Sequence, residues 1–272
     1  MPIRLLDREL LLRKIRTPLF FGPPNSRKTS GLLTFPFEED GSGDLVIFSF
    51  PGEEGYNTIP VGYPGVRAFI WEEPPGDAQS AMSMMDEVNA TLTRLIAGQL
   101  GNVKILAGDG FHNMYQVYMN VTTNGAFGRG EDLGERGGLA YGRAHQMANT
   151  FLRRFYAAPV PYKVLTAWDA READRVDPLT GRGDKSGHNW PMLPGQMAKW
   201  IVGKAGLTIF TKIEYPRTPM DKVTAYWQLK PDNEVWGAAV KTDPRFIEQI
   251  PDKVPQDWKL LEPLLTKCLE TP

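Results

Sequence analysis

The chain has 272 residues, of which 42% are hydrophobic and 23% charged, as in an ordinary soluble globular protein with one large α/β domain or two small ones. Its net charge of −1 excludes a global basic field, so binding of nucleic acid would need a local patch. A single cysteine, Cys268, excludes a disulfide framework or a multi-cysteine metal site within one chain and fits a reducing cytosol.

The N-terminal residues resemble neither a signal peptide nor a membrane anchor. Met1-Pro2-Ile3-Arg4 leads into a charged, interrupted segment rather than a clean apolar run. No apolar run approaches the roughly 20 residues that a membrane span requires. We therefore expect no membrane partner and a cytoplasmic location.

A glycine-proline turn near the N-terminus is the most informative motif. Leu5–Ile15 predicts a short helix or a strand lead-in, and Leu19–Phe21 predicts the first core strand. The chain then reads Gly22-Pro23-Pro24-Asn25-Ser26-Arg27-Lys28-Thr29-Ser30. This is the phosphate-loop pattern G-x-x-x-x-G-K-[ST], except that Arg27 stands at the second glycine.

Such a loop binds a nucleotide with its backbone and with two side chains. Its N–H groups wrap the phosphates, and the start of the following helix adds positive charge. Lys28 is expected at the terminal phosphates and Thr29 at Mg²⁺. The candidate nucleotide-binding residues are Gly22, Pro23, Asn25, Ser26, Arg27, Lys28, Thr29 and Ser30. Because the Cβ of Arg27 restricts the loop, hydrolysis could be weakened while binding stays intact; an ordinary turn before a helix is the alternative.

Two glutamates follow the next predicted strand. Asp44–Phe50 is a near-continuous apolar run, as in a strand buried on both faces. Glu53 and Glu54 lie just beyond its carboxyl end, where α/β sheets place their chemistry. Either glutamate could position a water for attack on the γ-phosphate, and two solvated turn residues are the alternative.

An aspartate ends a later strand in the same way. Val66–Trp71 predicts a strand, and Ala78–Leu100 predicts a helix. The expected inward face of this helix is Met82, Met85, Val88, Leu92, Leu95 and Ile96. Val103–Gly110 is an apolar strand that ends in Asp109, the pattern of a carboxylate that holds Mg²⁺. His112 is expected to be structural rather than a nucleotide sensor.

The second half of the chain predicts further elements around a polar loop. Residues 122–143 are rich in glycine and charge and predict a mobile loop. Helices are expected at 144–156, 194–201 and 258–269, a core strand at 162–168 that is followed by Asp169, and an antiparallel strand pair at 207–213 and 223–229.

A long polar segment, 171–189, is a candidate nucleic-acid interface. Long structureless loops in compact domains are usually functional. Its basic residues and the tryptophan beyond it could contact a phosphate backbone and stack on bases. These candidates are Arg171, Arg175, Arg182, Lys185 and Trp190. Four acidic residues within the segment dilute its charge, so a plain surface loop is the alternative.

The order of these motifs resembles the RecA-like core. More narrowly, it resembles the phage-encoded RecA-like ATPases, grouped with AAA-type phage nucleotide-binding proteins and Sak-type single-strand annealing proteins. The resemblance runs from about Pro18 to Arg245. Its motifs are Gly22–Ser30, Ile105–Asp109, Val164–Asp169, Pro191–Gly195 and Val240–Arg245.

The resemblance implies an α/β RecA-like P-loop NTPase, with a central, mostly parallel sheet flanked by helices and a C-terminal antiparallel hairpin. Residues 1–245 would form the core, and residues 246–272 a tail that packs on the core or on a neighbour. ATP and Mg²⁺ would bind between subunits of a homo-oligomeric ring or filament. Lys241 or Arg245 matches the basic residue that reaches the neighbour's γ-phosphate.

Single-stranded DNA is the partner that the resemblance implies, with a single-strand-binding protein as a further one. The activity would be ATP binding with hydrolysis in phage recombination or replication, in the host cytoplasm. Arg27 departs from the family pattern, and so does Trp168-Asp169, where a His-Glu pair is common. Three alternatives stay open: a non-hydrolysing nucleotide-binding scaffold, a virion structural or assembly protein on a degenerate P-loop fold, and a DNA-unwinding motor.

Overall fold

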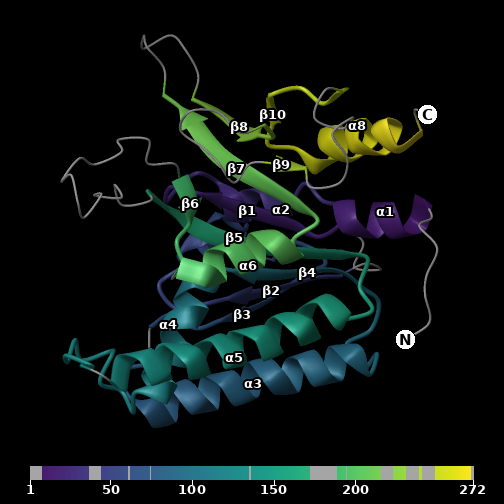
Figure 1. The fold of residues 1–272 in the computed structure, drawn as a ribbon. Helices are drawn as coiled ribbons and strands as arrows, with labels where there is room; N and C mark the ends of the chain where they lie inside the picture. Colours follow the sequence, from purple (N-terminus) through teal and green to yellow (C-terminus); the bar gives the residue numbers. More distant parts are fainter. Residues whose placement is uncertain are drawn as a thin grey trace, which may run out of the picture. The chain divides into compact units, whose positions relative to one another are not determined.

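The computed structural model describes residues 8–36, 44–60, 62–73, 75–134, 136–171, 189–193, 195–215, 223–230, 239–240 and 249–270. The fold is α/β, with mostly parallel strands flanked by helices and an antiparallel hairpin in the C-terminal part (Figure 1). The chain forms two compact units: unit 1 contains Met1–Pro36 and Thr166–Pro272, and unit 2 contains Phe37–Leu165. Within the described ranges, no helix is long and apolar enough to span a bilayer.

Unit 2 contains a parallel sheet. Its strands are β2 (Asp44–Ser49), β3 (Val66–Ile70), β4 (Val103–Asp109) and the first part of β5 (Tyr162–Arg171), in the order β3-β2-β4-β5. All three strand pairs are parallel. Residues 45–49 of β2 are buried, which explains the continuous apolar sequence of this strand. Because the pairs are parallel, the carboxyl ends of β2 and β4 lie at the same edge of the sheet.

Three helices pack together in unit 2. They are α3 (Ala78–Ile96), α4 (Phe111–Thr122) and α5 (Arg136–Ala157), and a short 3₁₀ helix, η1, covers Gly55–Thr58. Helices α3 and α5 run alongside each other, and α4 contacts both (Figure 1). Asp77 caps α3, since its Oδ1 accepts a hydrogen bond from the Ser80 N–H at 2.9 Å.

Sequence predictions for these helices were wrong in two places. The predicted loop at 122–143 overlaps α5, which begins at Arg136. Glycine costs only about 1 kcal/mol in a helix, and burial of Ala140 and Ala144 on this helix offsets that cost. On α3, Met82 and Ile96 are 48% and 42% exposed although both were expected inside, because Ala81, Met84 and Leu95 take the buried positions beside them.

Unit 1 is built around a parallel strand pair with antiparallel additions. Strand β1 (Pro18–Gly22) pairs in parallel with β7 (Leu207–Glu214), and β8 (Thr224–Gln228) pairs with β7 in the predicted hairpin. The remaining strands are β6 (Asn189–Pro191) on β5, β9 (Ala239–Val240) on β7, and β10 (Lys253–Pro255) on β8. The helices are α1 (Arg8–Ile15), α2 (Lys28–Leu32), α6 (Gly195–Lys204) and α8 (Trp258–Glu270).

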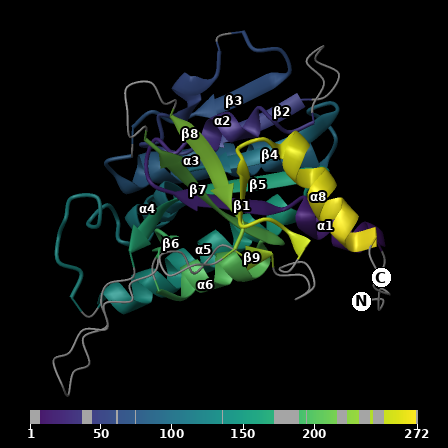
Figure 2. The ribbon, with the colours of Figure 1, turned by 90° about the horizontal axis from the view of Figure 1, so that it is seen from above.

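An aromatic cluster joins both ends of the chain in unit 1. Trp258 at the start of α8 stacks on Phe35, with ring centroids 4.3 Å apart. Phe20 of β1 stacks on Trp227 of β8 at 4.8 Å. At most 1% of each of these side chains is exposed. Helix α8 also lies beside α1 (Figures 1 and 2), so the C-terminal helix is part of the core of unit 1.

Candidate functional site

The loop between β1 and α2 has the backbone conformation of an anion-binding turn. Asn25 and Arg27 adopt left-handed conformations, with φ of 63° and 62°. Arg27 is followed directly by right-handed helical residues, an alternation that turns neighbouring N–H groups toward one concave side. Arg27 therefore adopts the conformation that glycine normally supplies at this position of the motif.

The Lys28 ammonium group is held by the first residues of this loop. Its Nζ donates hydrogen bonds to the carbonyl oxygens of Gly22 and Pro23, at 3.1 and 2.9 Å, and lies 3.4 Å from Ser26 Oγ. Only 6% of Lys28 is exposed, and the adjacent Thr29 is 5% exposed. The loop thus carries an ammonium, a hydroxyl and oriented backbone donors, the groups that bind a phosphate chain.

Residues that are distant in sequence form hydrogen bonds with the loop. Ser26 Oγ lies 2.6 Å from Oγ1 of Thr211 on β7. The Thr211 hydroxyl donates a hydrogen bond to the carbonyl oxygen of Phe21 at 3.1 Å. Gln256 Nε2 donates to the Ser26 carbonyl at 2.9 Å. A Cβ at Gly22 would lie 2.3 Å from the Thr211 carbonyl oxygen, so only glycine fits the first position of the motif. No local sequence pattern indicated Thr211 or Gln256.

Asp169 was not among the predicted site residues, yet it lies within electrostatic range of Lys28. It is near the end of β5, in the part of that strand that belongs to unit 1. Its carboxyl group is half-buried, and burial raises its pKa above 3.8 while the positive charge of Lys28 partly opposes the shift. The carboxylate of Asp169 therefore interacts electrostatically with the ammonium group of Lys28 within unit 1.

In unit 2, polar residues meet where β2 and β4 end. Ser49 and Asp109 are the last residues of these strands, pair in register and are fully buried. Ser49 Oγ has no hydrogen-bond partner among the described residues. The Phe50 N–H donates to the Asp109 carbonyl at 3.0 Å, which holds the two strand ends together.

The two predicted glutamates have different environments. Glu53 is 7% exposed, and its Oε1 lies 3.7 Å from His112 Nε2. Gly110 has φ of +79°, and a Cβ there would lie 2.1 Å from Glu53 Cγ, so this glycine makes room for the carboxylate. Glu54, by contrast, is exposed. Of the two candidates, only Glu53 is enclosed near the strand end that carries Asp109.

The predicted DNA-binding segment is described only at its two ends. Strands β5 and β6 pair so that Ala170 is opposite Trp190 and Arg171 is opposite Asn189. The remaining DNA-binding candidates, Arg175, Arg182 and Lys185, lie outside the described residues, and so do the two residues predicted to reach a neighbour's γ-phosphate, Lys241 and Arg245.

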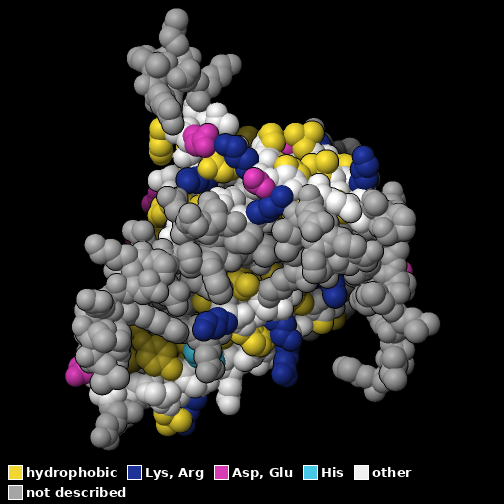
Figure 3. All heavy atoms as spheres, turned by 45° about the horizontal axis from the view of Figure 1, so that its top comes forward, with side chains coloured by type: hydrophobic (Ala, Val, Ile, Leu, Met, Phe, Trp, Pro, Cys, Tyr) yellow, Lys and Arg dark blue, Asp and Glu magenta, His cyan; other side chains and the backbone are white. Residues whose placement is uncertain are grey.

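Basic and acidic side chains lie next to one another on the part of unit 1 that carries the β7–β8 hairpin (Figure 3). Lys253 Nζ is 3.3 Å from Glu214 Oε1, and Lys230 Nζ is 3.0 Å from Asp252 Oδ1. The charges of these described residues therefore compensate one another in pairs.

The chain matches no protein-family model, and it has no match among curated proteins. Among the described residues, no group of three or more His, Cys, Asp or Glu side chains is arranged to hold a metal ion. The functional assignment therefore depends on the geometry of the loop in unit 1 and of the strand ends in unit 2.

Proposed function

We propose that the protein binds ATP through the loop Gly22–Ser30. The observation that carries this proposal is the left-handed backbone of Arg27 directly before Lys28, whose ammonium is held over the loop. Lys28 would contact the terminal phosphates, and the loop N–H groups would surround them. The proposed class is a RecA-like P-loop NTPase.

Mg²⁺ fits this loop as a companion of the nucleotide. Bound Mg²⁺ neutralises phosphate charge and takes most of its ligands from phosphates and water, so it needs few protein ligands. Thr29 follows Lys28 directly in the sequence, and its hydroxyl is the ligand from unit 1 that we propose for Mg²⁺. That Asp109 also orients the ion stays a prediction from the end of its strand.

An ATP analogue with a fluorescent ribose tests the nucleotide proposal. Displacement of the bound analogue is measured with ATP, ADP and AMP in the presence of Mg²⁺. Because the proposed contacts are to the phosphate chain, ATP should displace it at lower concentration than AMP, by roughly tenfold or more. Equal displacement by ATP and AMP, or no binding of the analogue, would contradict the proposal.

Hydrolysis, as opposed to binding alone, is proposed to depend on Glu53. Its carboxylate is enclosed, whereas that of Glu54 is exposed, and enclosure restricts the positions that the carboxylate and a water bound to it can take. Glu53→Gln should reduce phosphate release by roughly 100-fold, and Glu54→Gln should leave it within about twofold of wild type. If wild-type protein binds ATP but releases no phosphate, the non-hydrolysing scaffold replaces the ATPase.

Action on single-stranded DNA is the second part of the proposal. It is motivated by the arginine and lysine residues of the polar segment 171–189, and by the resemblance to phage annealing and recombination proteins. Binding of a labelled oligonucleotide should strengthen with ATP and weaken steeply with salt, since phosphate contacts release counterions. An affinity for DNA that does not change with salt concentration would favour the virion structural or assembly protein. Displacement of one DNA strand from a duplex would favour the DNA-unwinding motor.

A further inference from the structure

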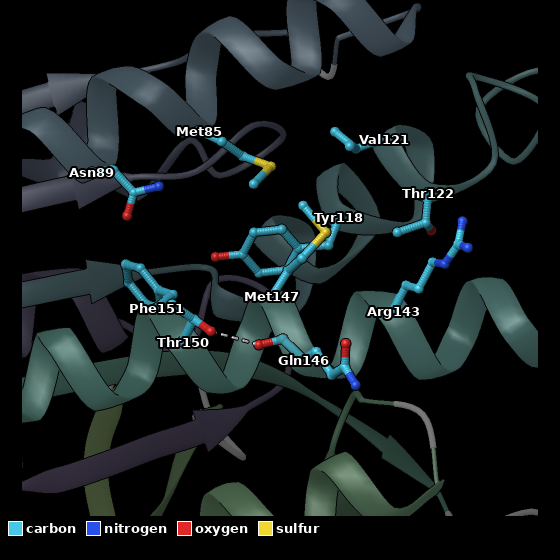
Figure 4. A pocket seen from close by; sticks show the side chains of 10 residues that line it. All are labelled: Met85, Asn89, Tyr118, Val121, Thr122, Arg143, Gln146, Met147, Thr150 and Phe151. Atoms are coloured by element: carbon cyan, nitrogen blue, oxygen red, sulfur yellow. Dashed lines mark hydrogen bonds between the residues drawn. The ribbon is translucent and has the colours of Figure 1, made fainter.

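Helices α3, α4 and α5 of unit 2 surround an open pocket of about 600 Å³ (Figure 4). This volume is in the range of sites that hold small organic molecules. All of its lining residues lie between Met85 and Phe151, so none belongs to the phosphate loop, and neither Glu53 nor Asp109 is among them. The pocket is therefore separate from the residues proposed to bind ATP.

The middle of the pocket is lined by an aromatic ring and two thioether side chains. The Tyr118 ring forms its centre, and the side chains of Met85 and Met147 approach this ring (Figure 4). Tyr118 is 2% exposed, so its ring is a fixed surface. Thioether side chains adapt their shape and make favourable contacts with aromatic rings. This part of the pocket suits a flat apolar group.

One end of the pocket carries a positive charge that has no ion-pair partner among the described residues. Arg143 and Thr122 lie together at the end away from Asn89 and Phe151 (Figure 4). None of the lining residues is Asp or Glu, and Arg143 forms no ion pair or hydrogen bond with the described residues. Its guanidinium group is thus available to hold a carboxylate, sulfonate or phosphate in a forked geometry.

Another arginine on α5 shows the contrast. Arg154 donates from Nη1 to Asn89 Oδ1 at 2.7 Å and from Nη2 to the Asn89 carbonyl at 3.1 Å. Arg154 therefore joins α5 to α3, while Arg143 has no such structural role among the described residues.

The hydroxyl of Tyr118 is a possible hydrogen-bond donor in the pocket. Burial raises the pKa of Tyr118 well above its usual value, so this hydroxyl stays protonated and can donate a hydrogen bond.

We propose that this pocket binds a small organic anion with a flat apolar body. The anionic group would lie at Arg143, and the body would lie between Met85, Met147 and the ring of Tyr118. This ligand site goes beyond the ATP site and does not depend on it, because the two use different residues.

The probe for this proposal is 8-anilinonaphthalene-1-sulfonate, with N-phenyl-1-naphthylamine as its neutral counterpart. Fluorescence titrations measure the affinity of each probe for the folded, full-length chain. Wild-type protein should bind one sulfonate probe per chain and prefer it to the neutral probe. Arg143→Gln should weaken binding of the sulfonate by about fivefold and leave the neutral probe unchanged.

Two further variants complete the test. Arg153 is exposed on the same helix and does not line the pocket, so Arg153→Gln should bind the sulfonate like wild type. Met147→Trp should fill the pocket and abolish binding of both probes, with circular dichroism confirming that the variant is folded. The proposal is overturned if Arg143→Gln and Arg153→Gln bind the sulfonate equally well, or if folded Met147→Trp binds it like wild type.

Discussion

Arg27 is a charged residue in a backbone conformation that usually belongs to glycine. Its φ of 62° brings its Cβ close to its own carbonyl group, which costs about 1–2 kcal/mol. Such strain is usually found at functional sites, where the surrounding structure maintains it. Here Lys28 and Ser26 hold the loop on both sides of Arg27, through the contacts of their side chains.

This strain predicts the effect of two substitutions at one position. Arg27→Gly should raise the free energy of unfolding by about 1 kcal/mol relative to Arg27→Ala, because only glycine removes the Cβ. Chemical denaturation of both variants measures the difference. Equal stability of the glycine and alanine variants would show that this residue is not strained in the folded protein.

Asp169 predicts a pH dependence of stability. Burial raises its pKa in the folded state above 3.8, so the folded chain holds this proton more tightly than the unfolded chain. Its contribution to stability is therefore present below pH 3.8 and is lost as the pH rises through the folded-state pKa. Asp169→Asn should stabilise the protein at pH 7, with a smaller gain at pH 3.5. Denaturation at both pH values tests this, and an equal gain at both would contradict it.

Individual site residues differed in how far the sequence could identify them. Lys28 and Thr29 follow from a local pattern, since the loop that holds them is continuous in sequence. Thr211 and Gln256 contact Ser26 from 185 and 230 residues away, so no local pattern could indicate them. The choice of Glu53 over Glu54 needed the burial of the side chains, which two adjacent glutamates do not reveal.

Among the elements, β7 connects the loop Gly22–Ser30 to the sheet of unit 1. Thr211 and Thr208 are both fully buried on this strand. The hydroxyl of Thr211 contacts Ser26 and Phe21, whereas the hydroxyl of Thr208 has no hydrogen-bond partner among the described residues. The two residues therefore form a matched pair for testing this connection.

Thr211→Val should lower the free energy of unfolding by about 1–3 kcal/mol, because it leaves the buried Ser26 hydroxyl and Phe21 carbonyl without this partner. Thr208→Val should leave stability unchanged or raise it, since it removes a buried hydroxyl that lacks a partner. Denaturant unfolding of both variants measures these changes. Similar losses in both would show that the hydroxyl of Thr211 does not brace the loop.

Sequence-based prediction of elements succeeded where a short apolar run is bounded by turn residues. Strands β2 and β4 are continuous apolar runs that end at turn residues, and both were predicted. Helix α4 was not predicted, because most of its residues are buried and it therefore lacks a clear polar face. The start of α5 was missed because its two glycines disfavour a helix locally, while packing on the neighbouring helices decides the structure.

At the scale of the whole molecule, the division into two units could not be predicted from a linear sequence. Unit 1 combines residues 1–36 with residues 166–272, and unit 2 is the segment between them. The first boundary lies next to an acidic stretch with glycine and serine, residues 38–44, but the second falls within strand β5, where no change of composition marks it. The α/β class, by contrast, follows from the alternation of apolar strands and amphipathic helices.

The proposed function requires that the loop around Lys28 binds the phosphates of ATP. Calorimetric titration of Mg²⁺-ATP into wild-type protein and Lys28→Ala tests it most directly, with Lys199→Ala, an exposed lysine of unit 1, as the control. We expect wild type and Lys199→Ala to bind Mg²⁺-ATP, and Lys28→Ala to bind it at least about tenfold more weakly. Unchanged affinity in folded Lys28→Ala, or no binding by wild-type protein at high concentration with DNA present, would contradict it.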